Sequence, residues 1–117
     1  MTKDPALYIF MRTDLNMSRG KIAVQAGHAV ALSMYQTTPL ILNPWMENNQ
    51  VKVVLAVNTL QEILNIENEC KKRDIHYKIV RDAGKTEVEQ NTITCIAVGI
   101  DERSRLRKLA SGYKSLN

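Results

Sequence analysis

Apolar residues gather in short runs along the chain, and these runs predict the strands of a sheet. Residues 7–12 (LYIFMR) and 51–57 (VKVVLAV) form nearly continuous apolar runs, which are typical of strands buried on both faces. Two further strands are expected at residues 76–80 and 92–100.

Capping residues predict helices after the first, second and last of these strands. Ser18 is a good N-cap for a helix that runs to about residue 35, and Asp101 can cap a last helix to about residue 110. Thr59 and Glu62 fit a capping box that opens a helix ending near residue 73. The segment 37–49 is ambiguous, because Pro39 could open a short helix that Pro44 would interrupt.

The resulting order, β-α-β-α-β-β-α, favours parallel strand pairs with helices on both faces of the sheet. The connection between residues 82 and 92 is too short for a helical crossover, so the third and fourth strands are expected to be antiparallel neighbours. We therefore expect one α/β domain over residues 1–117, a three-layer α/β/α arrangement with a four-stranded mixed sheet.

Composition narrows the possible functions only slightly. Aromatic residues are scarce (one Trp, one Phe and four Tyr), which argues against a nucleic-acid binder built on stacking aromatics. The formal net charge of +4 mildly favours an anionic partner. Cys70 and Cys95 lie far apart outside any Cys/His cluster, so no metal site is predicted. The apolar run 6–11 is too short to cross a membrane, so a reducing cytoplasm is the expected compartment.

Gly84-Lys85-Thr86 has the ending of a phosphate-binding P-loop, but the rest of that motif is missing. The first glycine would fall at position 79, which is Ile79. The sequence after Thr86 leads into a strand, whereas a P-loop leads into a helix whose N-terminus holds the phosphate. A nucleotide hydrolase is therefore excluded.

The first helix carries three polar residues at helical spacing, Lys21, Gln25 and His28. We expect them on one face, away from the stripe formed by residues 22, 26 and 29. They could form a site or simply a solvated face, and His28 could be a structural histidine. Arg19 and Lys21 lie in the first turn, where a cation is unfavourable unless an anion is brought to it.

Two further candidates lie around the third and fourth strands. Asp82 follows a buried strand directly, where ligands of open α/β sheets bind, but it could instead cap the turn by bonding to the amides of Gly84 and Lys85. Thr94 could be an ordinary strand residue, or its hydroxyl could hold a water molecule or a carbonyl group.

Three blocks together resemble the archaeal and eukaryotic-type (type 2) peptidyl-tRNA hydrolases. They are RTDLNMSRGKIAVQAGHA (12–29), VKVVLAV (51–57) and VRDAGKTEVEQNTITCIAVG (80–99), with a weaker echo in GYKSLN (112–117). The resemblance implies hydrolysis of the ester between peptide and tRNA, without a metal or organic cofactor, by an α/β domain that is often dimeric. It places the family's active-site residues on Lys21, Asp82, Thr86 and Thr94.

No Ser-His-Asp or Cys-His arrangement is evident, so direct attack by water is the simplest mechanism. Lys21 could stabilise the oxyanion or bind the terminal phosphate, and Asp82 could orient the water. Thr86 and Thr94 could position the water or the peptide carbonyl through their hydroxyl groups. An ion pair with Lys21 would make Asp82 a poorer base. His28 is the alternative base, because the ordinary pKa of histidine lies near neutrality. Arg19, Gln25, His28 and Lys85 are expected to contact the substrate.

Basic residues near the C-terminus are further candidates for tRNA phosphate contacts, although a run of this kind is more often an exposed helix face. They are Arg103, Arg105, Arg107 and Lys108. Two other functions stay open: a non-catalytic RNA- or protein-binding domain on the same scaffold, and hydrolysis of another acylated adduct at the same site.

Overall fold

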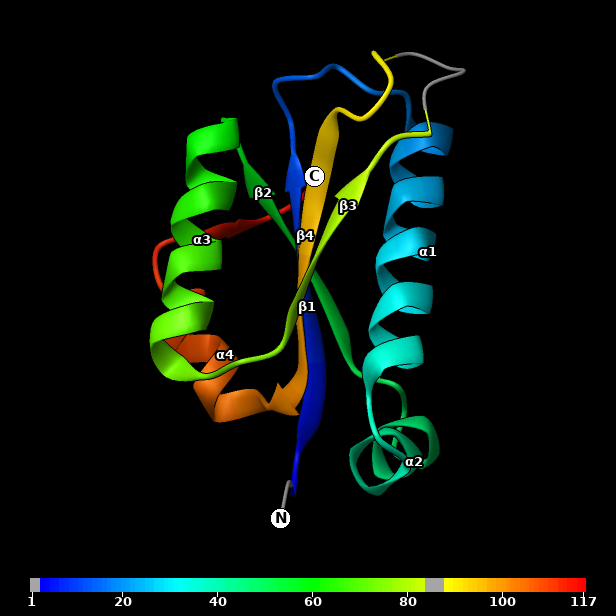
Figure 1. Ribbon diagram of the computed structural model, residues 1–117, viewed down its shortest axis with the longest axis vertical. Coiled ribbons are helices and arrows are strands. Elements are labelled where there is room, and N and C mark those ends of the chain that lie inside the picture. The colour runs from blue at the N-terminus through cyan, green and yellow to red at the C-terminus, as the bar shows by residue number, and fades with distance from the viewer. Residues whose placement is uncertain (1–2, 84–87) are drawn as a thin grey trace.

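The computed structural model describes residues 3–83 and 88–117. Helices and strands alternate over most of this chain (Figure 1). In chain order the elements are β1 (Pro5–Arg12), α1 (Arg19–Gln36), α2 (Pro39–Glu47), β2 (Lys52–Val57), α3 (Leu60–Arg73), β3 (Tyr77–Arg81), β4 (Ile93–Glu102), α4 (Arg103–Leu109) and β5 (Lys114–Ser115). None of the helices in these described ranges is long and apolar enough to cross a membrane.

The strands form one mixed sheet in the order β3-β4-β1-β2-β5. β1 and β2 are parallel, whereas β4 is antiparallel to both of its neighbours, β1 and β3. The predicted antiparallel pairing of the third and fourth strands is therefore confirmed. The prediction of four strands is wrong, because β5 adds a fifth at the edge of β2. Its two exposed residues are too few to show any apolar alternation.

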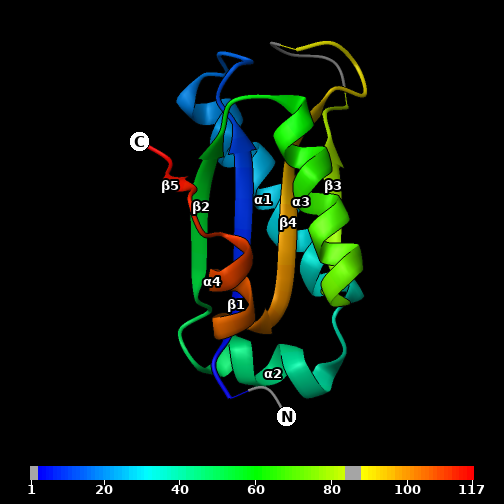
Figure 2. The same ribbon diagram turned by 90° about the vertical axis from the view of Figure 1, so that its left-hand side faces the viewer.

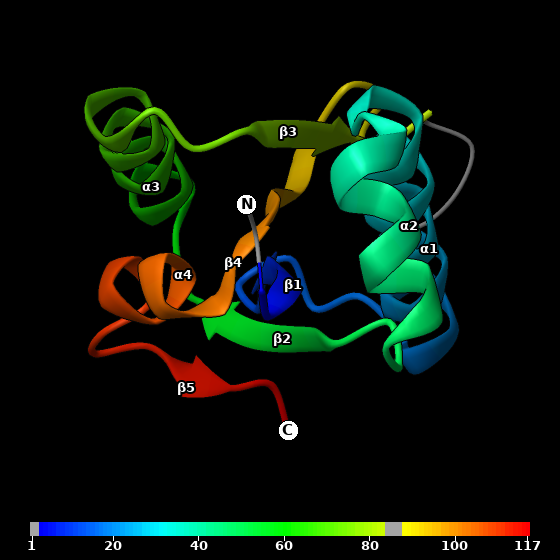
Figure 3. The ribbon, with the colours of Figure 1, turned by 90° about the horizontal axis from the view of Figure 1, so that it is seen from below.

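Both faces of the sheet are covered by helices, as the views along and across it show (Figures 2 and 3). Ala6, Tyr8 and Phe10 of β1 pack in one apolar cluster with residues of α3 and α4. Leu7 and Ile9, which alternate with them, pack in a second cluster with residues of α1 and α2. Burial on both faces explains why the strand sequences are nearly continuous apolar runs.

α2 continues through Pro44, where an interruption was expected. Pro39 occupies the start of the helix, where its missing N–H has no intrahelical partner to lose. Trp45, directly after Pro44, is fully buried, and its Nε1 donates to the carbonyl oxygen of Val51 at 2.9 Å. Packing of Trp45 offsets the hydrogen bond that Pro44 cannot make.

The last helix begins one residue later than predicted. β4 extends through Asp101, and Glu102 is the N-cap of α4. The Asp101 carboxylate accepts from the backbone N–H of Glu102 at 2.6 Å and from Nη1 of Arg105 at 2.8 Å. Asp101 therefore stabilises the turn into α4, but from the end of the strand.

The strand directions bring several chain segments to one end of the molecule. β1, β2 and β3 run in the same direction and β4 runs against them. The carboxyl ends of these three strands, the start of β4 and the N-terminus of α1 therefore meet at one edge of the sheet (Figure 1). Ligands of open α/β sheets bind outside this kind of edge.

Candidate active site

A buried ion pair joins α1 to the end of β3. Nζ of Lys21, in the first turn of α1, donates a hydrogen bond to Oδ1 of Asp82. The two side chains are 7% and 3% exposed, so water screens their attraction poorly. The Ser18 hydroxyl accepts from the backbone N–H of Lys21 at 3.2 Å and caps the helix, as predicted.

The backbone of Asp82 is fixed between the two strands that flank it. Its N–H donates to the carbonyl oxygen of Thr92, and its own carbonyl accepts from the N–H of Asn91, both at 2.9 Å. Asp82 thus extends the connection between β3 and β4 by one more pair of hydrogen bonds. This backbone attachment fixes the direction in which the carboxylate leaves the chain.

A second polar contact crosses the same helix–sheet interface. The hydroxyl of Thr94, on β4, donates to Oε1 of Gln25, on α1, at 2.5 Å. The carbonyl oxygen of Val80 is a weaker acceptor for the same proton, at 3.4 Å. Thr94 and Gln25 are 0% and 1% exposed, so their hydrogen bond belongs to the interior of the domain.

The buried row of α1 differs from the expected one. Lys21 and Gln25 are buried together with Ala29 and Ser33, whereas His28 is exposed. The prediction that Lys21 and Gln25 lie on a face away from Ala29 is therefore wrong. Each step of four residues turns only about 40° around a helix, so these four residues form one continuous row facing the sheet.

His28 lies away from the ion pair. It is seven residues beyond Lys21 on the same helix, which corresponds to a rise of about 10 Å along the axis. Its side chain is exposed, and it forms no hydrogen bond or ion pair within the described residues. Arg19 is also exposed, in the first turn of α1. Lys85 and Thr86, the other two predicted site residues, lie outside the described residues.

Neither cysteine is suited to act as a nucleophile. Burial raises the pKa of the Cys95 thiol, next to Thr94, to about 12, and the pKa of Cys70 is raised to about 12 for the same main reason. Both side chains therefore stay neutral thiols near neutral pH. Within residues 3–83 and 88–117, no three His, Cys, Asp or Glu side chains gather where they could hold a metal ion.

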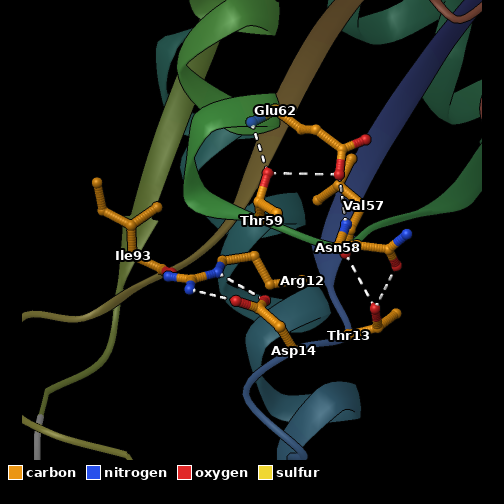
Figure 4. Close-up of polar contacts among 8 residues, drawn as sticks. All are labelled: Arg12, Thr13, Asp14, Val57, Asn58, Thr59, Glu62 and Ile93. Atoms are coloured by element: carbon orange, nitrogen blue, oxygen red, sulfur yellow. Dashed lines mark hydrogen bonds and ion pairs between the residues drawn. The ribbon is translucent and has the colours of Figure 1, made fainter.

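The structure also shows a polar network at the ends of β1 and β2 that the sequence did not indicate (Figure 4). Arg12, the last residue of β1, binds Asp14 and the carbonyl oxygen of Ile93, and Thr13 binds the end of β2. The available signal was an arginine at the end of a buried strand, followed two residues later by an aspartate. A hollow of about 470 Å³ borders the network, and its lining includes Thr13 but none of the predicted site residues that the structure describes.

These observations define a class of protein: a small α/β domain with a buried lysine–carboxylate pair at the carboxyl edge of a mixed sheet. Such a pair can stabilise negative charge on an oxygen and orient a water molecule. The sequence profile of the peptidyl-tRNA hydrolase PTH2 family matches residues 6–116. The chain belongs to this family.

Curated relatives agree with this assignment along almost their whole length. A peptidyl-tRNA hydrolase of Thermoplasma acidophilum is 39% identical over 113 residues, which cover 94% of this chain and 97% of the relative. One from Methanothermobacter thermautotrophicus is 38% identical over 108 residues, covering 92% and 96%. A solved structure of a protein of unknown function from Agrobacterium tumefaciens matches the fold, with a TM-score of 0.55 at 14% identity over 99% of this chain and all of that one.

Proposed function

We propose that this chain hydrolyses the ester bond between peptide and tRNA, and that the Lys21–Asp82 pair is the centre of the reaction. The observation that carries the proposal is the burial of this ion pair at the carboxyl edge of the sheet, in a chain of the PTH2 family. The curated relatives named above are peptidyl-tRNA hydrolases. A domain that only bound RNA would have no need of a buried charge pair, which is costly to keep.

The reaction we propose is direct attack by water on the ester carbonyl. The water oxygen bonds to the carbonyl carbon, the bond from that carbon to the ribose oxygen breaks, and the ribose oxygen leaves with a proton as a hydroxyl. The peptide is released as a carboxylate, and the second proton of the water passes to the solvent. The Lys21 ammonium stabilises the negative charge that develops on the carbonyl oxygen.

Asp82 is proposed to orient the attacking water as a charged acceptor. The ammonium group of Lys21 beside it favours the ionised carboxylate. An ionised carboxylate held in place by the backbone bonds to Thr92 and Asn91 presents a fixed acceptor to a water proton. This geometry favours orientation of water over removal of its proton as the main role of Asp82.

Gln25 and Thr94 are proposed to support the site from within. Both side chains are almost fully buried, and their hydrogen bond holds α1 against β4 next to the ion pair. Contact of Gln25 with the substrate, which the sequence suggested, fits this burial poorly. For Thr86 we propose the role of an active-site residue, as the family resemblance implies.

We further propose that tRNA is bound through phosphate contacts that include Arg19 and Lys85, and that the protein acts in the cytoplasm as a homodimer. The exposure of Arg19 beside the site supports the first part, and the family resemblance supports the others. The helices on both faces of the sheet support the description of the domain as three α/β/α layers.

The decisive experiment follows the release of free tRNA from peptidyl-tRNA, with aminoacyl-tRNA as a second substrate. Wild type is expected to release tRNA from peptidyl-tRNA, and Asp82→Ala to lose at least about 100-fold in rate, the size typical of removing an essential polar group. Asp4→Ala, which changes an exposed carboxylate, is the matched control and is expected to match wild type.

The outcomes separate the activity from its site. If the wild-type protein does not release tRNA, the proposed enzyme activity is wrong, and RNA binding without turnover would favour the non-catalytic alternative. If Asp82→Ala turns over as fast as wild type, the proposed activity is retained but the assignment of Asp82 to the site is wrong. Release from aminoacyl-tRNA at an equal rate would point to a broader ester hydrolase.

A further inference from the structure

The guanidinium group of Arg12 joins the end of β1 to Asp14, in the connection that follows, and to Ile93 at the start of β4 (Figure 4). Nε and Nη2 donate to the two carboxylate oxygens of Asp14 at 3.0 and 2.7 Å, which is the bidentate geometry of the strongest arginine–carboxylate pairs. Nη1 donates in a third direction, to the carbonyl oxygen of Ile93 at 3.1 Å. The Arg12 side chain is 12% exposed and that of Asp14 is 36% exposed, so the guanidinium group is largely buried while its carboxylate partner still contacts water.

The contact with Ile93 extends the attachment of β1 to β4 beyond the backbone ladder. The last backbone pair of the two strands joins Met11 to Cys95. Arg12 then reaches the carbonyl of Ile93 with its side chain. Thr94, whose hydroxyl binds Gln25 of α1, therefore lies between two residues that are both attached to the end of β1.

The contact with Asp14 holds the connection from β1 to α1. Between the two residues of the pair, the Thr13 N–H donates to the carbonyl oxygen of Val57 at 2.8 Å, which fixes the connection to the end of β2. The same connection ends at Ser18, the residue that caps α1 and precedes the helical turn carrying Lys21. The hydrogen bond from Arg12 lowers the pKa of the Asp14 carboxyl below its ordinary value, so the pair stays ionised near neutral pH.

Arg12 therefore links the two halves of the proposed site. Through Asp14 it fixes the segment that leads to Lys21, and through Ile93 it fixes the strand start that carries Thr94 and pairs with the end of β3 before Asp82. Shifts of about 1 Å between catalytic groups can lower rates about 100-fold. A rigid link at this position is suited to prevent such a shift.

We propose that Arg12, held by Asp14, is a positioning residue that sets the geometry of the Lys21–Asp82 pair relative to Thr94. The proposal rests on the proposed hydrolysis at that pair. Arg12 acts through the chain segments it joins and is not assigned a contact with the substrate.

Arg105 provides a matched control at another place in the same molecule. It also pairs with an aspartate, Asp101, and also donates to backbone carbonyl oxygens, those of Arg73 and Asp74. It joins α4 to the end of α3. Because its guanidinium group is already bound to these three acceptors, we assign Arg105 neither to the proposed site nor to tRNA binding. Arg105→Met therefore removes the same kind of link without touching the site.

The first test compares Arg12→Met and Arg105→Met in steady-state kinetics. Arg12→Met is expected to lower kcat by about 10- to 100-fold with KM nearly unchanged, because it disturbs the reacting geometry more than substrate binding. Arg105→Met is expected to keep the wild-type kcat. Arg12→Lys is expected to have a kcat as low as that of Arg12→Met, because a single ammonium group cannot replace the guanidinium group in its contacts with both Asp14 and Ile93. Equal kcat values in the two Met variants, or wild-type activity in Arg12→Lys, would overturn the proposal.

The second test asks whether Arg12 acts through Thr94. In a double-mutant cycle, Arg12→Met is expected to lower kcat much less when Thr94→Val is already present, whereas Arg105→Met and Thr94→Val should be additive. Additive losses of kcat for Arg12→Met and Thr94→Val would contradict action through this residue.

A third measurement does not depend on turnover and separates this inference from the proposed function. Amide hydrogen exchange at Lys21 and Asp82 is expected to be faster in Arg12→Met than in Arg105→Met at the same temperature, because both amides lie in the segments that Arg12 links. Asp14→Asn, which keeps the shape of the side chain, provides a milder variant if Arg12→Met folds poorly. Wild-type exchange at both amides in Asp14→Asn would overturn the link even in an active enzyme.

Discussion

Lys21 and Asp82 are two opposite charges that the fold removes from water almost completely. Their side chains are 7% and 3% exposed. Each charge loses most of its hydration on folding, and their mutual attraction offsets that loss only while both are present. The pair is therefore a weak source of net stability, but the loss of either partner removes the attraction that offsets the desolvation of the other charge.

A buried pair of this kind predicts a characteristic pattern of stability. Lys21→Met should lower the free energy of unfolding by about 3–5 kcal/mol, because it removes the ammonium group that offsets the buried charge of Asp82. The double variant Lys21→Met/Asp82→Leu should be more stable than Lys21→Met, because no unpaired charge remains. Urea unfolding measures both. A double variant as unstable as the sum of the two single variants would show that the charges are not coupled.

At the scale of the elements, apolar periodicity and capping residues were sufficient to locate four strands and three helices. β5 was not predicted because it has only two residues. The helix continues through Pro44 because burial of Trp45 outweighs the loss of one backbone hydrogen bond at the proline. These two features depend on contacts between segments, which short-range patterns do not contain.

For the candidate site too, the sequence indicated individual residues but not the contacts between them. Lys21, Asp82 and Thr94 were singled out, but their spatial relation came only from a resemblance. Lys21 lies 61 residues from Asp82, and Thr94 lies 69 residues from Gln25. Lysine and glutamine are usually exposed, so a buried row that contains both could not be read from helical spacing alone.

The capping box at the start of α3 gives a prediction at the same scale. The Thr59 hydroxyl accepts from the N–H of Glu62 at 3.1 Å, so Thr59→Ala should lower the free energy of unfolding by about 1 kcal/mol. Thr38, the N-cap of α2, forms no side-chain capping bond in the described part of the chain, and Thr38→Ala is the matched control. Urea unfolding of both variants checks the difference, and equal stability would rule out a contribution from the cap.

At the scale of the whole molecule, the basic residues of α4 lie far from the ion pair. β4 runs from the site end of the sheet to the start of α4, so the two lie at opposite ends of this ten-residue strand (Figure 1). Arg105 is bound to Asp101 and to the end of α3, whereas Arg107 and Lys108 are exposed and form no hydrogen bond or ion pair within the described residues. Of these three cations, Arg107 and Lys108 are the better candidates for contacts with tRNA phosphates.

This arrangement predicts how binding should depend on salt. If Arg107 and Lys108 each contact a phosphate, Arg107→Glu/Lys108→Glu should reduce the slope of log affinity against log salt concentration by about 1.5–2. The value of kcat should stay near that of wild type, because neither residue lies at the site. Titration of tRNA at several salt concentrations measures the slope. An unchanged slope would mean that α4 presents only a solvated face.

Because the ion pair is buried, dissolved salt affects it differently from the charges at the surface of the same domain. The attraction of charges at the surface is weakened by dissolved ions over a distance of about 8–10 Å, whereas a pair enclosed by protein is screened far less. Ionic strength should therefore govern how often substrate is captured but not how fast captured substrate reacts. A chain built in this way can adapt to cells of very different salt content by exchanging surface residues alone, with the buried pair left unchanged.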